Sequence, residues 1–258
     1  MRRPPGTGFE ATVRNVTFTG QRFRFEPGYY VTAVDGLGGA QPSHHGVPMM
    51  NGYGEFDAAN QYEDARIITI SGFAYDLTPE AIGRRRRRLD GLLAGRDDSA
   101  VLRWSEDGSD FRIPLVRRGV GSKAQRRVGA WRFADFTARF RAPDQRYFGQ
   151  AEAFGPAQSI TVSHWGETFA PLALKVEGNL PGGYVITHPA GIVQVTRPLA
   201  TGHPHTFDMD TGLLSVDGVI VAGGLGTVQL WEVPPGAPGQ VSVTFGAVLS
   251  TVVENTFM

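Results

Sequence analysis

The chain has 258 residues, and its 25 basic and 25 acidic side chains give a formal net charge of zero. With 41% hydrophobic and 19% charged residues, it is typical of a globular protein with a core, long enough for one large or two ordinary domains. The absence of cysteine excludes disulfides and thiolate metal sites. No run of about 18 apolar residues is present, so no insertion into a membrane is expected.

Charge is divided unevenly along the chain. Residues 1–150 contain 23 Lys and Arg against 17 Asp and Glu, a balance of +6, whereas residues 151–258 contain 2 against 8, a balance of −6. This change of sign predicts two domains with different surfaces, residues 1–148 and 166–258. Residues 149–165 read as a linker, because the alternating pattern weakens there. Opposite charges would also allow head-to-tail attraction between copies of the chain.

The first domain opens with alternating patterns that predict half-buried strands. "ATVRNVTF" and "QRFRFEP" place apolar residues, among them Phe23 and Phe25, between polar ones. "GYYVTAVDG" and "ARIITISGFAYDL" predict further strands, and "AVLRWSEDGSDFRIPLVRRG" predicts a hairpin with its turn at "EDGSD". In "VGAWRFADFTARFRAPD" the alternation slips at Ala134–Asp135, which predicts a bulge. We therefore expect a mainly β domain, sandwich or barrel-like.

A long irregular stretch, residues 36–64, interrupts these strands. It contains Gly and Pro and has little periodicity. A loop of this length inside a compact domain is usually functional or flexible. His44 and His45 lie in it and are expected to be exposed contact residues rather than catalytic ones.

The stretch "TPEAIGRRRRRLDGLLAG" predicts the domain's one amphipathic helix, over about residues 79–94. Thr78 is a suitable N-cap and is followed by Pro79 at the first helical position, while Gly95 is a natural stop. The apolar side chains of this segment fall on one stripe: Ile82, Leu89, Leu92 and Leu93.

Five consecutive arginines lie within this helix: Arg84, Arg85, Arg86, Arg87 and Arg88. They could bind phosphate groups, but the domain carries only +6 and has no helix-turn-helix, RNA-recognition or zinc-finger pattern. Sequence-specific binding of nucleic acid is therefore not expected. A solvated or protein-contacting face is favoured, since the planar guanidinium group pairs well with carboxylates. Arg85 and Arg86 lie beside the apolar stripe, where their aliphatic stems could cover it.

The second half consists almost entirely of short predicted strands. They recur about every 8 to 12 residues with Gly, Pro and Asp between them, which predicts a β-sandwich. "SVDGVIV" is a good signal for a tight hairpin, because Asp-Gly tolerates the positive φ angles of such a turn.

Candidate chemical sites are few. "HPHTFDMD" places His203, His205, Asp208 and Asp210 close together, a potential metal site, but a proline separates the histidines and no further ligand cluster supports it. The serine-hydrolase, zinc-protease and P-loop motifs are absent. We expect no metal, no cofactor and no catalytic residues, so the chain is not predicted to be an enzyme.

Three stretches of the second half resemble the distal tail protein (Dit) family of long-tailed bacteriophages: "PLALKVEGNLPGGYVITHP", "TFDMDTGLLSVDG" and "QLWEVPPGAPGQVSVTF". The residues that match the family pattern are Asp210, Thr211, Asp217, Gly218, Trp231, Pro235 and Gly236. In the first half, "ARIITISG" followed by a helix and "LDGLLAG" is also similar. Two departures are Asp217, where Asn is common, and an extra proline in "VPPG".

This resemblance implies a structural role in the virion tail. The second domain would be a galectin-like β-sandwich, and the first would build a hexameric ring around a DNA channel, with a long loop belting the neighbouring copy. The ring would join the tail-tube protein to the tail-tip hub, with the tape-measure and receptor-binding proteins as further partners. The start, "MRRPPGTGFEA", leads into no apolar segment, which suits assembly in the host cytoplasm. Arg84 to Arg88, with His44 and His45, are the candidate contact residues.

A second hypothesis is a carbohydrate-binding or receptor-binding module that acts at the host cell surface. Trp165, Tyr184 and Trp231 are its candidate stacking aromatics. Trp231 lies in an alternating strand, which favours a place in the core for it.

Overall fold

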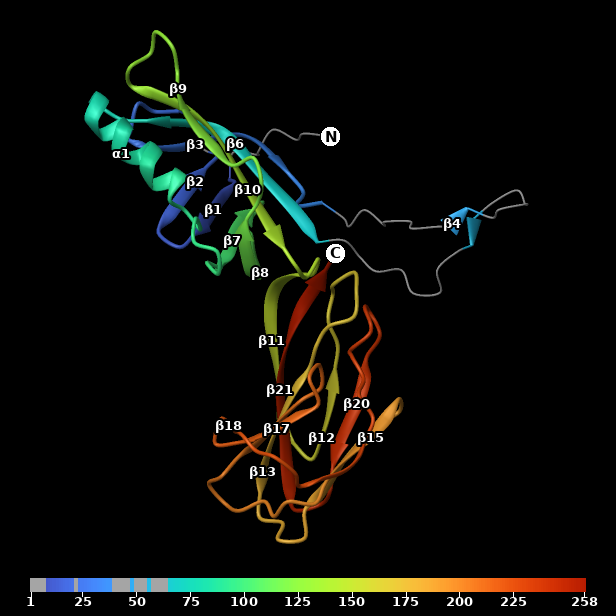
Figure 1. The fold of residues 1–258 in the computed structure, drawn as a ribbon. Coiled ribbons are helices and arrows are strands. Elements are labelled where there is room, and N and C mark those ends of the chain that lie inside the picture. Colours follow the sequence, from blue (N-terminus) through green and yellow to red (C-terminus); the bar gives the residue numbers. More distant parts are fainter. Residues whose placement is uncertain (1–7, 21–22, 39–46, 49–54, 57–64) are drawn as a thin grey trace. The chain divides into compact units, whose positions relative to one another are not determined.

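The computed structural model describes the chain except for residues 1–7, 21–22, 39–46, 49–54 and 57–64. The chain forms two compact units, Met1–Tyr147 with Met258, and Phe148–Phe257 (Figure 1). Both are mainly β, as predicted. Within the described part, no helix is long and apolar enough to cross a membrane.

The first unit is a closed barrel of seven strands. In spatial order these are β8 (Ser109–Arg118), β7 (Ala100–Glu106), β1 (Glu10–Val13), β2 (Val16–Thr19), β3 (Gly28–Asp35), β6 (Arg66–Tyr75) and β10 (Phe133–Ala142). The barrel closes where β10 pairs with β8. Strand β9 (Lys123–Arg126) also pairs with β10, and the two-residue strands β4 (Val47–Pro48) and β5 (Glu55–Phe56) pair with each other.

Side chains of alternating residues fill the barrel. On β10 the inward residues are Ala134, Phe136, Ala138, Phe140 and Ala142, all buried. The register between β10 and β6 is continuous, so the bulge expected at Ala134–Asp135 is wrong. The apparent slip in the pattern arises because Phe133 belongs to the outer face of the strand, which is also apolar here.

The segment 23–27, predicted to be a strand, is not one. Strands β2 and β3 pair in parallel, so the chain between them must cross over rather than turn in a tight hairpin. Phe25 lies in this crossover with a φ of 59°, a left-handed conformation outside the β region. The alternating phenylalanines therefore reflect packing on the outside of the barrel.

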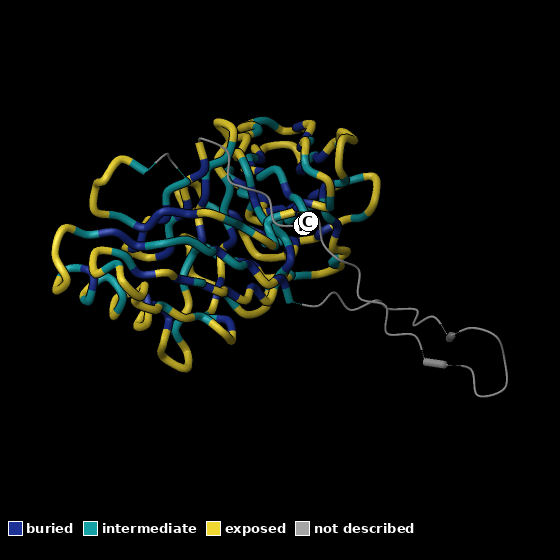
Figure 2. Tube along the Cα trace, turned by 90° about the horizontal axis from the view of Figure 1, so that it is seen from above, coloured by how far each residue is buried: buried dark blue, intermediate teal, exposed yellow. Residues whose placement is uncertain are grey.

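Helix α1 (Pro79–Asp90) packs on β6, β9 and β10. It begins where predicted but ends four residues before position 94. Gly91 is the C-cap, and Leu93 then turns into a left-handed conformation, with a φ of 52°. The predicted apolar stripe is buried throughout, because this turn brings the two leucines after the helix back onto the core. Figure 2 shows burial along the trace.

The second unit is a β-sandwich of two antiparallel sheets. One contains β18 (Val219–Ile220), β17 (Leu213–Val216), β16 (His205–Asp208), β13 (Ala173–Gly178), β21 (Ala247–Phe257) and β11 (Tyr147–Ala157) in that order. The other contains β12 (Ser159–Val162), β20 (Gly239–Val243), β14 (Tyr184–His188), β15 (Gly191–Val195) and β19 (Leu225–Val228). A single hydrophobic core joins the two sheets.

Residues 149–165, interpreted from the sequence as a linker, instead lie mostly in β11 and β12. Most side chains of β11 are exposed or half-buried, and Phe148 is its one buried residue. A strand with so little burial shows no clear alternation in its sequence. The alternation of apolar and polar residues is therefore weak in residues 149–165 although most of them lie in strands.

Candidate interaction surface

The N-terminus of α1 forms as the sequence predicts. The Thr78 hydroxyl accepts a hydrogen bond from the backbone N–H of Ala81 at 3.2 Å, which satisfies one of the free donors of the first turn. Pro79 occupies the first helical position, and Glu80 complements the positive end of the helix dipole. These contacts set where the helix begins and thereby which way each arginine points.

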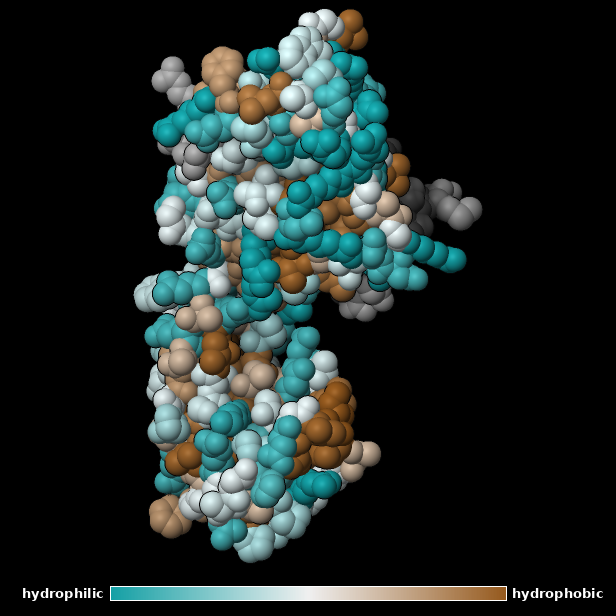
Figure 3. Space-filling view, turned by 90° about the vertical axis from the view of Figure 1, so that its left-hand side faces the viewer, coloured by the Kyte–Doolittle hydropathy of each residue, from teal (hydrophilic) through white to brown (hydrophobic). Residues whose placement is uncertain are grey.

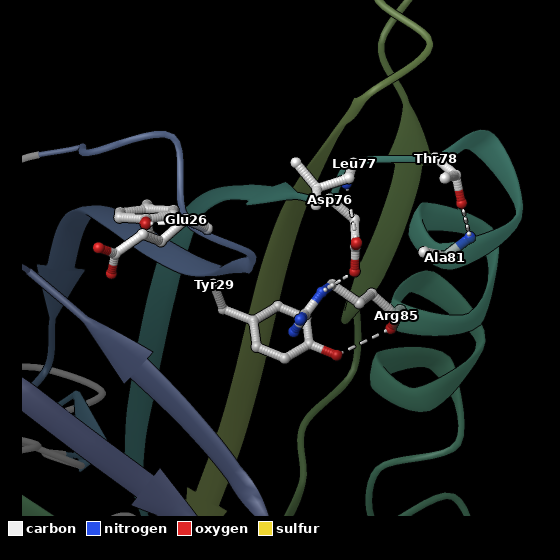
Figure 4. A network of polar contacts seen from close by, with 8 residues as sticks. Glu26, Tyr29, Asp76, Leu77, Thr78, Ala81 and Arg85 are labelled. Atoms are coloured by element: carbon white, nitrogen blue, oxygen red, sulfur yellow. Dashed lines mark hydrogen bonds and ion pairs between the residues drawn. The ribbon is translucent and has the colours of Figure 1, made fainter.

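Arg85 points toward the barrel. Its Nε donates to Asp76 Oδ2 at 2.6 Å, and its guanidinium carbon lies 5.3 Å from the centre of the Tyr29 ring (Figure 4). The hydroxyl of Tyr29 in turn donates to the backbone carbonyl of Arg85 at 3.1 Å. Burial raises the pKa of Tyr29 above its usual value, so this hydroxyl keeps its proton at neutral pH. Arg85 thus anchors the helix to β3 and to the end of β6.

The other four arginines point differently. Arg88 donates to the backbone carbonyl of Asn15 in the β1–β2 turn, although the rest of its side chain is exposed. Arg84 and Arg87 are exposed and Arg86 is half-buried, and none of the three has an acidic partner among the described residues. The sequence places the five arginines together, and the fold separates them into one anchor, one turn contact and an unpaired basic face.

Of the long loop 36–64, the described residues are 36–38 and the short strands β4 and β5. Arg66, buried at the start of β6, donates from Nη1 to the carbonyls of Gly36 and Gly38, both at 2.9 Å, and from Nε to the carbonyl of Gln145 at 2.8 Å. Sequence reasoning missed this residue, whose only signal is a charge directly before the apolar run of β6. His44 and His45 lie outside the described residues.

The family-pattern residues of the second unit lie mainly in turns. Asp208 Oδ1 accepts from the N–H groups of Asp210 and Thr211 in the β16–β17 turn. Asp217 and Gly218 form the predicted tight turn, with φ angles of 51° and 79°. Asp217 therefore adopts the left-handed backbone conformation that this turn requires, although Asn is the common residue at this position of the family pattern.

The remaining matched residues lie near Trp231. Trp231 is buried, as expected, and stacks on His188 with 4.9 Å between ring centres. Gly236, which follows Pro235, donates its N–H to the carbonyl of His164. The ring of His164 in turn bonds the carbonyl of Val233 and the N–H of Gly166. His164 is a second buried organiser that the sequence reasoning did not single out.

The four residues of the potential metal site do not converge on one point. His203 pairs with Asp217 through Nδ1 and Oδ2, 2.8 Å apart, whereas Nδ1 of His205 lies 3.2 Å from the hydroxyl of Tyr184. Asp208 is used by its own turn. No group of three metal-binding side chains occurs in the described part of the chain.

Of the three aromatic residues proposed to stack on a glycan, one is exposed. Tyr184 and Trp231 are buried in the sandwich core and cannot stack on a sugar. Trp165 is 83% exposed, with its backbone N–H held by Asn255 Oδ1 at 2.7 Å. A single exposed ring gives no grouping of aromatic and polar side chains for a sugar.

Acidification is expected to destabilise the second unit. Burial, aided by nearby Arg197, lowers the pKa of His205 below 6.5, and burial also lowers that of His188. The unfolded chain therefore binds protons first as pH falls, so stability is full above about pH 6.5 and declines below it. Thermal unfolding followed from pH 8 to pH 5 should show this fall in Tm.

The same titration of two variants assigns the effect. His205→Gln and His188→Gln should each reduce the dependence on pH, because each removes one of the rings whose pKa burial lowers. Equal slopes for the parent chain and His205→Gln would contradict this origin.

No protein-family model matches the chain, and no curated protein matches its sequence. The fold is nevertheless similar, over nearly the whole chain, to that of a solved bacteriophage protein. This similar protein is SPP1 Dit, gp 19.1, whose crystal structure is described as a paradigm of the hub adsorption apparatus in phages that infect Gram-positive bacteria. It matches with a TM-score of 0.75 and 14% identity over 97% of this chain and 99% of that chain.

A chain of the phage P2 baseplate, in its activated conformation with Ca, is also similar. Its TM-score is 0.45 at 8% identity, and the match covers 83% of this chain and 87% of that one.

Proposed function

We propose that the chain is a structural protein of a bacteriophage tail, a distal tail protein without enzymatic activity. The observation that carries this proposal is the likeness to SPP1 Dit, which spans nearly the whole of both chains. The likeness thereby extends over residues of both units. Since fold alone does not determine function, the proposal needs a test of assembly.

In this function, copies of the chain form a hexameric ring at the end of the tail tube, around the channel through which DNA leaves. One face of the ring meets the tail-tube protein and the other the tail-tip hub, with the tape-measure and receptor-binding proteins as further partners. The unpaired basic face of α1 supports a role in protein contacts, because unpaired guanidinium groups are well suited to carboxylates on a partner. The long loop 36–64 is proposed to reach a neighbouring copy.

Native mass measurement and negative-stain imaging of the purified chain test this function. A ring of several copies with a central hole is the expected result. If the chain is a monomer, the same measurement is repeated with the tail-tube protein encoded with it, since assembly can require that partner. A chain that remains monomeric in both samples would contradict the proposal.

Reversing charge on the exposed face of α1 is expected to weaken assembly. Arg84→Glu combined with Arg87→Glu removes two unpaired cations without disturbing the anchor, Arg85. The variant should keep the parent's Tm, because exposed substitutions usually change stability by less than about 0.5 kcal/mol. Its assembly, measured by sedimentation, should be weaker and less sensitive to salt.

A control with the same change in charge uses exposed arginines on strands of the barrel instead of on α1. Arg103→Glu combined with Arg117→Glu, on β7 and β8, meets this requirement. Equal loss of assembly in both double variants would mean that net charge, rather than the face of α1, controls the contact.

A further inference from the structure

An aromatic cluster covers part of the outer face of the barrel. Its strand residues are Tyr30, Phe73, Tyr75 and Phe133, which alternate with the core-facing positions of β3, β6 and β10. Phe23, from the crossover before β3, packs on all four, with ring centres 5.0 to 5.9 Å away, and lies 4.6 Å from Phe25. Tyr30 and Tyr75 are buried within this cluster, whereas Phe25 is open to solvent.

The exposed end of this cluster combines rings with arginines. Arg127 lies over the rings of Phe73 and Phe133, at 5.8 and 5.7 Å, and the guanidinium of Arg132 lies 4.2 Å from the ring of Trp131. We name as the aromatic tip five residues of the crossover and of the β9–β10 turn: Phe25, Arg127, Val128, Trp131 and Arg132.

Its apolar members are open to solvent. Phe25 is 69%, Val128 99% and Trp131 44% exposed. Exposed aromatic side chains together with arginine are the composition of the energetically important centre of a protein interface. Arg127 pairs with Asp135, whereas the neighbouring Arg126 is exposed and has no acidic partner among the described residues. The tip is thus an apolar centre with a basic rim.

A second exposed apolar surface lies on the other unit, at the end of its larger sheet. Strand β18 pairs only with β17, so it is an edge strand. Val219 and Ile220 on β18 are 65% and 64% exposed, and Leu213 on β17 is 45% exposed. Ile220 and Leu213 lie on one face of the sheet and Val219 on the other, so apolar side chains flank the edge on both sides. We name these three residues the β17–β18 edge. Brown hydrophobic side chains reach the surface of both units in Figure 3.

The surroundings of this edge are acidic. Asp217, which pairs with His203, lies in the turn between the two strands, and Asp210 lies in the turn before β17. The whole second unit carries 2 basic and 8 acidic residues, a balance of −6. An unprotected edge with exposed β-branched residues is a favourable place for another chain to dock. Its charge is opposite to that of the aromatic tip.

We propose that the aromatic tip of one copy docks on the β17–β18 edge of another copy. Two aromatic tips facing each other would bring arginine against arginine, which is electrostatically unfavourable. When an aromatic tip meets a β17–β18 edge, apolar side chains meet apolar side chains, and the basic rim of the tip faces the acidic surroundings of the edge. Such a contact joins unlike surfaces, and contacts of this kind close into rings when the rotation between copies allows it. The inference rests on the proposed function, because it names the surfaces through which copies would meet.

The absence of native cysteine allows a clean test by cross-linking. A chain with Ala130→Cys, beside Trp131, is mixed with a chain carrying Ala222→Cys, two residues after Ile220, and a short bis-maleimide is added. As control, the same Ala130→Cys chain is mixed with Ile192→Cys, on β15 of the other sheet and exposed. Docking raises the effective concentration of the paired thiols, so the first mixture should form the mixed dimer at least about tenfold faster. Equal rates would overturn the proposed contact.

Native mass measurements on the same samples separate this inference from the proposed function. If assemblies form while the two cross-linking rates are equal, copies meet elsewhere and only the contact is wrong. If the chain stays monomeric, with and without the tail-tube protein, and gives no preferential cross-link, both are wrong. A variant with Val128→Ser and Trp131→Ser, which are both exposed, should keep the parent's Tm and lose self-association by about tenfold or more, as expected for residues at the centre of an interface. Unchanged self-association in it would also overturn the contact.

Discussion

Gly72→Ala is expected to disrupt the barrel of the first unit. A Cβ at position 72 would lie 1.9 Å from the backbone carbonyl oxygen of Tyr30, where the register of β3 and β6 shifts between Val31 and Ala33. Because backbone rather than a flexible side chain occupies the space, the two strands would have to separate. We expect a loss of more than about 3 kcal/mol in the free energy of unfolding, in the range of the most damaging single substitutions.

Gly83→Ala is the matched control. Gly83 lies inside α1, and a Cβ there would meet no atom within 4 Å. Because alanine favours a helix over glycine by about 1 kcal/mol, this change should stabilise the first unit slightly. Hydrogen exchange measured by mass spectrometry localises both effects: Gly72→Ala should expose the amides of β3 and β6, and Gly83→Ala should not. Parent-like protection in Gly72→Ala would show that the strands can shift to accept the methyl group.

Arg85→Ala is expected to have the next largest effect. The carboxylate of Asp76 is only 14% exposed and would lose its cation, and Tyr29 would lose the guanidinium that covers its ring. Hydrogen bonds to charged groups contribute about 1.5–3 kcal/mol, and a loss in that range is expected in urea unfolding. Arg84→Ala removes an equally long but exposed side chain and should change stability by less than about 0.5 kcal/mol.

A double substitution tests the reason for this loss. If the cost of Arg85→Ala comes mainly from leaving Asp76 unpaired, then adding Asp76→Ala should recover part of it. Additive losses in the two single variants would instead mean that each residue stabilises the unit through separate contacts.

Local features of the helix and of the tight turns were predictable from the sequence. The N-cap, the apolar stripe and the Asp-Gly turn at 217–218 follow from rules that involve residues close together in the chain. The order of short strands and the family-pattern residues indicated the fold that the comparison with SPP1 Dit supports. By contrast, the segment 23–27 has the alternation of a strand, and the sequence offers no sign that its phenylalanines pack on the outside of a barrel.

What the sequence by itself determined is the set of local elements, the division of charge between the two halves, and the presence of five arginines on one helix. Only the tertiary structure decided which arginine is an anchor, because Asp76 and Tyr29, 9 and 56 residues from Arg85, become its neighbours through the pairing of β3 with β6. It also decided that β11 is a strand and that the aromatic tip exists. These features depend on contacts between segments that are distant in the sequence. The periodicity of a single segment does not indicate which other segment it packs against.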